Sequence, residues 1–429
     1  MDERWTHGDE LVAEYVHRTA RSGELHERLC RVMPAGQTRS LVYFAPYPVA
    51  LAEGDGPLVR DVDGNEYVDV LNNYTSLVHG HGHRAITEAV RAALETGTAF
   101  PAPHASQLEL AELLHERFPA AERVRFTNSG TEGTLLALRI ARAATGRRTV
   151  LAFEGAYHGT VPELADGGGD VVRVPYNDAE ASERVLDDAV AAVIVEPFLG
   201  SGGVVPAAPG FLERLRARAA AVGALFVLDE VQSLRNSFSG VHGELGLEPD
   251  LVVVGKIVGG GFPVGGVVGR AALLARTDPR RPDAIAHSGT FNGNVVTTVA
   301  GAAALRLLDG DAIAALHARA AALAAAIEAA AARAGLRAAV SRAGSIMQVH
   351  LRGTRPHTAA TPGPEERRAI AALHLALLLE GVYAAPRGML NLSTVMTDDH
   401  LARVASGYER AFARVRALLG EPVVEAATR

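Results

Sequence analysis

Between about residues 106 and 310, short runs of apolar and β-branched residues alternate with stretches that have a helical pattern. Neighbouring parallel strands need a crossover connection between them, usually a helix, and this alternation supplies one. We therefore predict an α/β fold whose large domain is a mostly parallel sheet wrapped by helices. The strand-like runs are TVLAF (149–153), VVRV (171–174), AVIVE (192–196), ALFVLDE (224–230), LVVVG (251–255) and GGVVG (265–269).

The pattern differs on either side of this region. Residues 9–33 have apolar side chains at helical spacing, and the Asp-Gly pairs at 55–56 and 63–64 indicate small antiparallel hairpins. Residues 311–335 are rich in alanine and predict a long helix that Gly335 ends. Beyond it we expect a strand (345–351), a loop (353–364), a helix (365–380), a short strand within MLNLST and a closing helix (397–419).

These segments group into two domains. We predict a large domain over residues 71–310 and a smaller α+β domain built from residues 1–70 and 311–429. No long polar linker divides the chain. At ~100–200 residues per domain, the 429 residues fit this division.

Composition disfavours several classes of function. The net charge of -7 and the pI of about 6.2 give no global positive charge for phosphate backbones, so we expect no nucleic-acid partner. The single cysteine, Cys30, cannot form a disulfide within the chain. The charged start MDERWTHGDE lacks the apolar core of a signal peptide, and no apolar run approaches the ~18 residues that span a bilayer. We therefore expect a soluble, cytoplasmic protein with no membrane partner.

Three histidines, His79, His81 and His83, recur at every second position in HGHGHR. On a strand they would share one face, as ligands of a metal could. However, no carboxylate partner is obvious beside them, and the chain has no CxxC pair. We expect an ordinary loop here and no metal site.

Lysine is almost absent from the sequence. Of its 42 Lys and Arg residues, 41 are arginine, and Lys256 is the only lysine. A lysine amine can condense with an aldehyde, whereas an arginine guanidinium stays protonated and cannot. Lys256 follows the strand LVVVG and precedes the glycine-rich IVGGGFPVGG. This position favours a functional lysine over a chance surface residue.

Three more features lie where strands of the large domain end, the edge at which open α/β sheets bind ligands. Ser129, Gly130 and Thr131 precede a helix expected near Glu132, and such a terminus suits a phosphate, although Ser and Thr also cap helices for structural reasons. Asp229 could hold a protonated ring nitrogen, but Glu230 or a purely structural aspartate is an alternative. Tyr157, beside His158, could stack on a flat cofactor, although such pairs also occur in plain turns.

A phosphate cradle, an aspartate for a ring nitrogen, a stacking aromatic ring and a Schiff-base lysine together describe a site for pyridoxal 5'-phosphate (PLP). The chain resembles class III aminotransferases of the fold type I PLP enzymes. It is most similar to the branch that holds β-amino-acid (β-phenylalanine) aminotransferases and glutamate-1-semialdehyde aminomutase. The motifs that carry this resemblance, in this order, are NSGTE, YHG, VEP, LDEV, GKIVGGGFPVGG and HSGTFNGN.

The resemblance implies roles for individual residues. Lys256 matches the lysine of the internal aldimine, Asp229 the partner of the pyridinium nitrogen, and Val231 the residue beneath the ring. Tyr157 matches the ring stacker, while Ser129, Gly130 and Thr131 match the phosphate loop. Thr290 matches a threonine that reaches the phosphate of the neighbouring subunit, which implies a homodimer.

The resemblance also implies transamination between small amino and keto acids, and two arginines are candidates for binding a substrate carboxylate. Arg39, in GQTRS, matches the carboxylate arginine of this branch, and Arg387 matches the PRG motif of β-amino-acid transaminases. Val295 stands where aminomutases usually have proline. Leu199 stands where many class III enzymes have glutamine, which disfavours an ordinary ω-amino-acid transaminase. Wall residues suggested only by their nearness to motifs are Phe44, Tyr47, Tyr74 and Phe291.

A PLP-dependent aminotransferase of β-amino acids, aromatic ones included, is therefore the leading hypothesis. A glutamate-1-semialdehyde-type aminomutase or a PLP-dependent racemase is the alternative with the same cofactor. A non-catalytic PLP-fold regulator is disfavoured because Lys256 and Asp229 are both present. A P-loop ATPase is excluded because GTEGTLL does not match GxxxxGK[ST].

Overall fold

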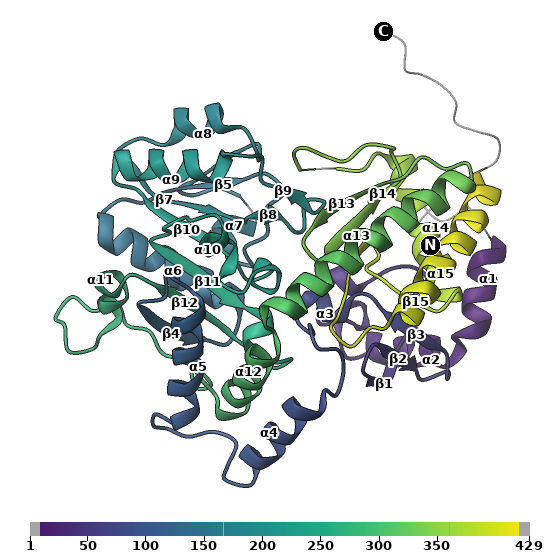
Figure 1. The fold of residues 1–429 in the computed structure, drawn as a ribbon, viewed down its shortest axis with the longest axis horizontal. Helices are drawn as coiled ribbons and strands as arrows, with labels where there is room; N and C mark the ends of the chain where they lie inside the picture. Colours follow the sequence, from purple (N-terminus) through teal and green to yellow (C-terminus); the bar gives the residue numbers. More distant parts are fainter. Residues whose placement is uncertain (1–8, 166, 360, 420–429) are drawn as a thin grey trace.

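The computed structural model describes residues 9–165, 167–359 and 361–419, and a seven-stranded sheet organises the middle of this part of the chain (Figure 1). Residues 1–8, on which the prediction about a signal peptide rests, lie outside the described residues. The strands are, in spatial order, β4 (Arg123–Thr127), β12 (Gly265–Gly269), β11 (Leu251–Gly255), β10 (Leu225–Asp229), β7 (Val190–Val195), β5 (Thr149–Phe153) and β6 (Val171–Val174).

The sheet is mostly parallel, which confirms the predicted α/β fold. One strand, β12, runs antiparallel to both of its neighbours, β11 and β4. The connection from β11 to β12 spans only residues 256–264, too short for the crossover of a dozen or more residues that a parallel neighbour needs. The length of this connection therefore sets the direction of β12.

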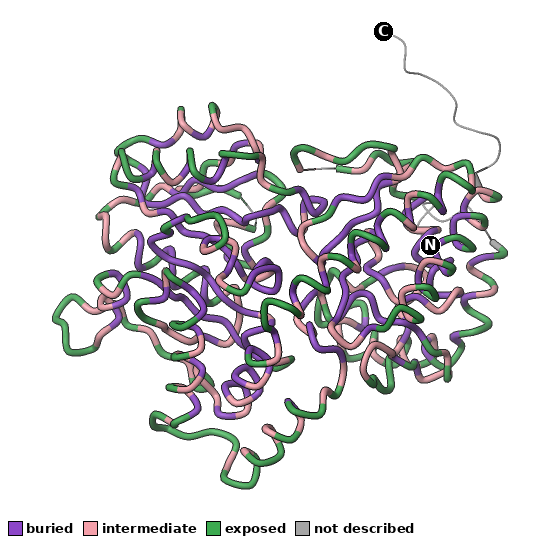
Figure 2. The backbone as a smooth tube through the Cα atoms, in the orientation of Figure 1, coloured by how far each residue is buried: buried purple, intermediate pink, exposed green. Residues whose placement is uncertain are grey.

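Helices cover both faces of the large sheet, and the strands accordingly read as continuous apolar runs. In β11, Leu251 and Val253 pack in a cluster with helix α6 (Gly130–Thr145), whereas Val252 and Val254 join the core on the opposite face. In Figure 2 the buried trace follows the strands, and the exposed trace follows the outer helices and loops. The helices α5 (Ala105–Arg117) and α9 (Phe211–Val222) pack against the opposite face.

Two smaller sheets lie beside the large one in Figure 1 and join distant parts of the chain. Strand β15 (Val382–Tyr383) pairs parallel with β3 (Glu66–Asp69), so N-terminal and C-terminal segments share one sheet. The other small sheet has the strand order β13-β14-β16, and the sequence analysis did not predict β13. The predicted domain boundaries, at 70/71 and 310/311, stay predictions. The other strands here are β1 (Leu51–Asp55), β2 (Leu58–Asp61), β13 (Ala339–Ala343), β14 (Ile346–His350) and β16 (Met389–Asn391).

Most of the predicted helices form within a few residues of the expected positions. The segment 9–33 contains two helices instead of one, separated at Thr19. The helices not yet given are α1 (Asp9–Arg18), α2 (Ala20–Cys30), α3 (Asn72–Thr75), α4 (Arg84–Leu94), α7 (Pro162–Ala165), α8 (Ala179–Val185), α10 (Gly240–Glu244), α11 (Ala271–Leu274), α12 (Val295–Leu307), α13 (Gly310–Arg333), α14 (Pro364–Leu379) and α15 (Asp398–Leu419). The 3₁₀ turns are η2 (Pro34–Gly36), η3 (Ser40–Val42), η4 (Ser233–Asn236), η5 (Lys256–Gly259) and η6 (Ala275–Thr277), and a small hairpin joins β8 (Phe198–Leu199) to β9 (Val205–Pro206).

One helix, α13, corrects the expectation that no apolar stretch is long enough to cross a bilayer. By length and composition alone it would qualify, and it is the single such helix in the described part of the chain. However, its larger side chains, including Ile313, Leu316, Leu323 and Ile327, belong to the main core, and the helix packs against α15. Its apolar composition comes mainly from alanine, which also suits a helix that lies on a protein core.

Candidate active site

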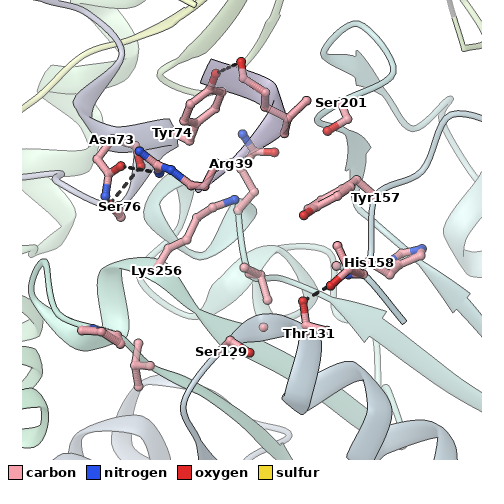
Figure 3. Close-up of a pocket in the computed structure, with 18 of the residues that line it drawn as sticks. Arg39, Asn73, Tyr74, Ser76, Ser129, Thr131, Tyr157, His158, Ser201 and Lys256 are labelled. Atoms are coloured by element: carbon pink, nitrogen blue, oxygen red, sulfur yellow. Dashed lines mark hydrogen bonds between the residues drawn. The ribbon is translucent and has the colours of Figure 1, made fainter. Parts of the chain in front are cut away.

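One cavity of about 820 Å³ opens at the carboxyl ends of strands β4, β10 and β11 (Figure 3). This is the edge at which the sequence placed the chemistry. The structure brings together every predicted site residue except Thr290. Those that line the cavity are Arg39, Ser129, Gly130, Thr131, Tyr157, Asp229, Val231, Lys256 and Arg387.

Lys256 is the first residue of η5, directly after β11. Its backbone is left-handed, with φ of 50°, a conformation that costs a non-glycine residue about 1–3 kcal/mol and that is common at functional sites. Burial lowers the pKa of its ammonium to about 8, and the charges of Arg387 and Arg235 act in the same direction, against those of Asp229 and Glu196. Part of the Lys256 population is therefore a neutral amine near neutral pH.

Asp229 ends β10, and the residue is only 5% exposed. Its Oδ1 accepts a hydrogen bond from the Val231 amide at 3.0 Å, and its Oδ2 accepts one from His158 Nδ1 at 2.7 Å. Burial opposes protonation of His158, but the hydrogen bond and charge of Asp229 outweigh burial and raise the pKa of the imidazole. The sequence reading named His158 only as the neighbour of Tyr157, and its contact with Asp229 comes from the structure.

The start of α6 is where the sequence predicts an anion cradle. Ser129 is the N-cap, and its Oγ accepts from the Glu132 amide at 3.2 Å. Thr131 Oγ1 accepts from the Thr160 amide at 3.2 Å, so a second loop closes over the helix terminus. Gly159, with φ of +83°, allows this approach, because a Cβ there would lie 2.2 Å from Thr131 Oγ1. The first amides of a helix have no partner within the helix and suit a phosphate.

Among the polar cavity residues that the sequence analysis did not single out, Glu196 and Gln232 bear most on the chemistry. The Glu196 carboxylate is buried, accepts from the amides of Tyr157 and Gly200, and has its pKa raised to about 7 by burial. Gln232 reaches the cavity from the loop after β10, beside Met389. A glutamine is therefore present in the site, although the glutamine position read from the sequence holds the buried Leu199.

The two arginines predicted to bind the substrate carboxylate, Arg39 and Arg387, both contact the ring of Tyr74. Each guanidinium carbon lies 5.8 Å from the centre of the Tyr74 ring. Arg39 is exposed and donates from Nη1 to Asn73 Oδ1 at 2.8 Å. Arg387 is largely buried: its Nε has no hydrogen-bond partner, and its Nη2 contacts only the Met389 sulfur, at 3.2 Å, among the interactions of the described residues. Burial lowers the pKa of Arg387.

Thr290 and three of the suggested wall residues lie elsewhere. Thr290 is exposed and outside the cavity lining, and Phe291 beside it is 59% exposed. Phe44 packs edge-on against His374 in the core, and Tyr47 packs against Tyr15. Nearness in sequence to a motif was therefore a wrong guide for Phe44 and Tyr47, while Phe291, like Thr290, lies outside the cavity of the single chain.

Two of the three histidines of HGHGHR, His79 and His81, have hydrogen-bond partners, and these partners differ. His79 is buried between Thr394 and the Ala304 carbonyl, and His81 Nε2 lies 2.7 Å from Asp69 Oδ2. A carboxylate partner thus exists for His81, contrary to the sequence reading. No group of three or more potential metal ligands occurs within residues 9–165, 167–359 and 361–419.

Comparison with known proteins adds to this geometry. The aminotransferase class-III family model matches residues 43–411. The chain belongs to the class III aminotransferase family. This class III aminotransferase is 38% identical to the β-phenylalanine transaminase of Variovorax paradoxus over 88% of this chain and 89% of that protein. It is 35% identical to glutamate-1-semialdehyde 2,1-aminomutase 2 of Geobacillus kaustophilus over 92% of this chain and 99% of that protein.

A solved structure shows the same fold. The ω-transaminase from Sphaerobacter thermophilus superimposes with a TM-score of 0.88 at 39% identity, covering 92% of this chain and 98% of that one. The class III aminotransferase described here is therefore a PLP-dependent enzyme of fold type I. Its cavity suits PLP: it offers a helix N-terminus for the phosphate, a buried carboxylate for the ring nitrogen, and a partly neutral lysine for the aldehyde.

Proposed function

We propose that this class III aminotransferase moves an amino group between a β-amino acid, aromatic ones included, and a keto acid. Arg387 carries the proposal. Its guanidinium is largely buried in the cavity, forms no ion pair with a carboxylate among the described residues, and leaves Nε without a partner. A buried cation costs free energy unless an anion reaches it. The carboxylate of the substrate is that anion.

Arg39 supplies a second carboxylate ligand. It lines the same cavity from the opposite end of the chain and is exposed, so it can bind without the cost of burial. An aminotransferase takes up two acids in turn, an amino donor and a keto acceptor, and two arginines allow their carboxylates to be held differently. The likeness to a β-phenylalanine transaminase supports an aromatic β-amino acid as the donor, and Tyr74, Tyr157 and Phe262 provide aromatic cavity walls.

The family resemblance gives each of these cavity residues a cofactor role, and their shared place in the cavity supports it. When PLP is bound, Ser129, Gly130 and Thr131 would hold its phosphate, Tyr157 and Val231 would pack against its ring, and Asp229 would keep the ring nitrogen protonated. PLP, when bound, supplies an electron sink for the carbanion that forms when the substrate loses a proton.

Lys256 has two tasks. Its neutral amine would hold PLP by condensing with the aldehyde, with release of water, and in its free form the same amine would be the base that carries the substrate proton. The lowered pKa serves both tasks, because each needs the unprotonated amine. No other lysine in the sequence can replace it.

We also propose that the enzyme is a cytoplasmic homodimer. Thr290 lies on the surface of the single chain, outside its own cavity. In a dimer it would reach the phosphate of the neighbouring subunit. Sedimentation analysis tests the dimer, and a Thr290→Ala substitution should weaken PLP binding only if the subunits share their sites.

The function is tested with the purified enzyme and a panel of β-amino acids, α-amino acids and amines. A β-amino acid alone should remove the visible absorption of bound PLP, and a keto acid should restore it. No change with any β-amino acid would refute the proposal. Product formed without an added keto acid would indicate an aminomutase or a racemase instead.

A further inference from the structure

A left-handed turn forms one wall of the cavity. Asn72, Asn73, Tyr74 and Thr75 have φ angles of 47°, 47°, 55° and 76°, and none of the four is glycine. A left-handed helical conformation costs an L-residue about 1–2 kcal/mol. Such a turn persists only where its surroundings hold it, and turns of this kind are concentrated at binding sites.

Hydrogen bonds to both ends of the turn hold it in place. At its start, Asp69 Oδ1 accepts from the amides of Leu71 and Asn72, each at 2.8 Å. The buried Asn391 donates from Nδ2 to the Leu71 carbonyl at 2.7 Å, and Asn72 Nδ2 donates to the Asn391 carbonyl at 3.0 Å. His81, in turn, is hydrogen bonded to the other oxygen of Asp69.

Arg235 holds the far end. Its Nη1 donates to the Thr75 carbonyl at 3.3 Å and to Asn391 Oδ1 at 2.8 Å. Its other nitrogens donate to Ser345 Oγ and to the Leu392 carbonyl. The residue is 1% exposed, and no carboxylate pairs with it among the described residues. A buried, unpaired cation is costly, so hydrogen bonding to these four acceptors is its evident task.

The left-handed turn also contacts the two arginines, Arg39 and Arg387, that are proposed to bind the substrate carboxylate. Asn73 Oδ1 accepts from Arg39, and the Tyr74 ring contacts both Arg39 and Arg387. Tyr74 also donates its hydroxyl to the Leu41 carbonyl at 2.6 Å. Figure 3 shows Arg39, Asn73, Tyr74 and Ser76 grouped at one side of the cavity, beside Lys256.

We propose that Arg235 is a positioning residue that sets where Arg39 lies relative to the cofactor. It belongs to the segment 229–236, which begins with Asp229, and its guanidinium reaches the turn that holds Arg39. Arg235 thereby fixes the distance between the carboxylate end and the reacting end of a substrate. The inference rests on the proposed function of Arg39 as a carboxylate ligand.

The test compares Arg235→Gln with the parent enzyme in single-turnover and steady-state assays. Glutamine removes the guanidinium without adding a second lysine. We expect the KM for a β-amino acid to rise about tenfold, as for the loss of hydrogen bonds to a charged group, while an amine without a carboxylate reacts almost as before. In an Arg39→Ala background the same substitution should raise the KM less than about twofold. Arg333→Gln, at an exposed ion pair with Glu409, is the matched control.

Each other outcome decides the matter. An equal loss with the carboxylate-free amine, or an undiminished effect in the Arg39→Ala background, would show a merely structural role and overturn the proposal. If Arg235→Gln does not fold, Asn73→Ala replaces it in the test. Asn73 is exposed, and its substitution removes the hydrogen bond by which the turn holds Arg39. A KM raised by Asn73→Ala only while Arg39 is present supports the proposal, and an unchanged KM overturns it.

A failure of the proposed function can be distinguished from a failure of the Arg235 proposal. If Arg39→Ala alone leaves the KM for β-amino acids unchanged, the carboxylate contact is wrong. Hydrogen exchange of the PLP-loaded enzyme then decides whether Arg235 holds the turn. Faster exchange at the amides of residues 71–76 in Arg235→Gln supports that role, and unchanged exchange overturns it.

Discussion

His158 Nδ1 donates a hydrogen bond of 2.7 Å to Asp229 Oδ2, and both side chains are buried. Asp229 therefore has one oxygen committed to His158 and the Val231 amide on the other, so its carboxylate plane is fixed. We expect His158→Ala to weaken PLP binding roughly 10–100-fold, because hydrogen bonds to charged groups contribute about 1.5–3 kcal/mol. Titration of the apoprotein with PLP, followed by absorbance, measures the change.

The control for this prediction is His17→Ala. His17 is exposed, lies in α1 and is not among the residues that line the cavity. It should leave the PLP affinity unchanged. Equal PLP affinity in His158→Ala and the parent enzyme would show that Asp229 is oriented without the imidazole.

Lys256 should react as an unusually acidic ammonium. Burial lowers its pKa from 10.5 to about 8, so in the apoprotein the neutral amine becomes dominant as the pH rises through about 8. Labelling with an amine-specific reagent from pH 6 to pH 10, read by mass spectrometry of the peptide that contains Lys256, should give a midpoint near 8. Because the chain has one lysine, no other side-chain amine competes for the label.

Loss of the lysine provides the matching experiment. Lys256→Ala should abolish covalent fixation of PLP by borohydride, whereas Arg333→Lys, which adds a lysine at an exposed position, should not restore fixation in the Lys256→Ala protein. A midpoint of labelling near the ordinary lysine value, or fixation of PLP without Lys256, would contradict the assigned role.

The sequence allowed Lys256, Asp229, Ser129 and Tyr157 to be predicted as neighbours because each lies at the end of a strand or shortly after it, and parallel strands bring their carboxyl ends to one edge. On the substrate side it indicated Arg39, Arg387 and Tyr74, which line the cavity, but not the left-handed turn that carries Tyr74. A left-handed turn is usually signalled by glycine, yet Asn72–Thr75 has none. Its stabilising partner Arg235 is an ordinary arginine in sequence, and contacts Asn391 across 156 positions.

The same reasoning explains the misplaced aromatic residues. Phe44 and Tyr47 are near Arg39 in sequence, but of these three residues only Arg39 lines the cavity, because the chain turns between Arg39 and Phe44. Which side of a loop faces a cavity depends on tertiary packing, and a motif does not encode it.

Glu196 should make the apoprotein less stable as the pH rises. Burial raises its pKa from 4.5 to about 7, so the folded protein binds this proton more tightly than the unfolded chain does. The resulting stability is fully present below about pH 4.5 and is lost as the pH rises through about 7. The melting temperature of Glu196→Gln, minus that of the parent, should therefore increase between pH 5 and pH 8.

Since other groups titrate in the same range, only the difference between the two proteins is informative. The exposed Glu180→Gln, in α8, serves as the control and should give a difference that does not vary with pH. A constant difference for Glu196→Gln would mean that its carboxylate ionises normally in the folded protein.

Gly159→Ala should impair the phosphate cradle in particular. A Cβ at Gly159 would lie 2.2 Å from Thr131 Oγ1, so either Thr131 or the loop must move away from the N-terminus of α6. We expect the affinity for PLP to fall about tenfold or more, while the affinity for pyridoxal, which has no phosphate, changes little.

Gly146→Ala is the matched control, because Gly146 also has a positive φ, +70°, but a Cβ there meets nothing within 4 Å. It shares the backbone strain and lacks the clash. Equal losses of PLP and pyridoxal binding in Gly159→Ala would mean that the substitution disturbs the whole site, and that the contact between Thr131 and Gly159 does not shape a phosphate site.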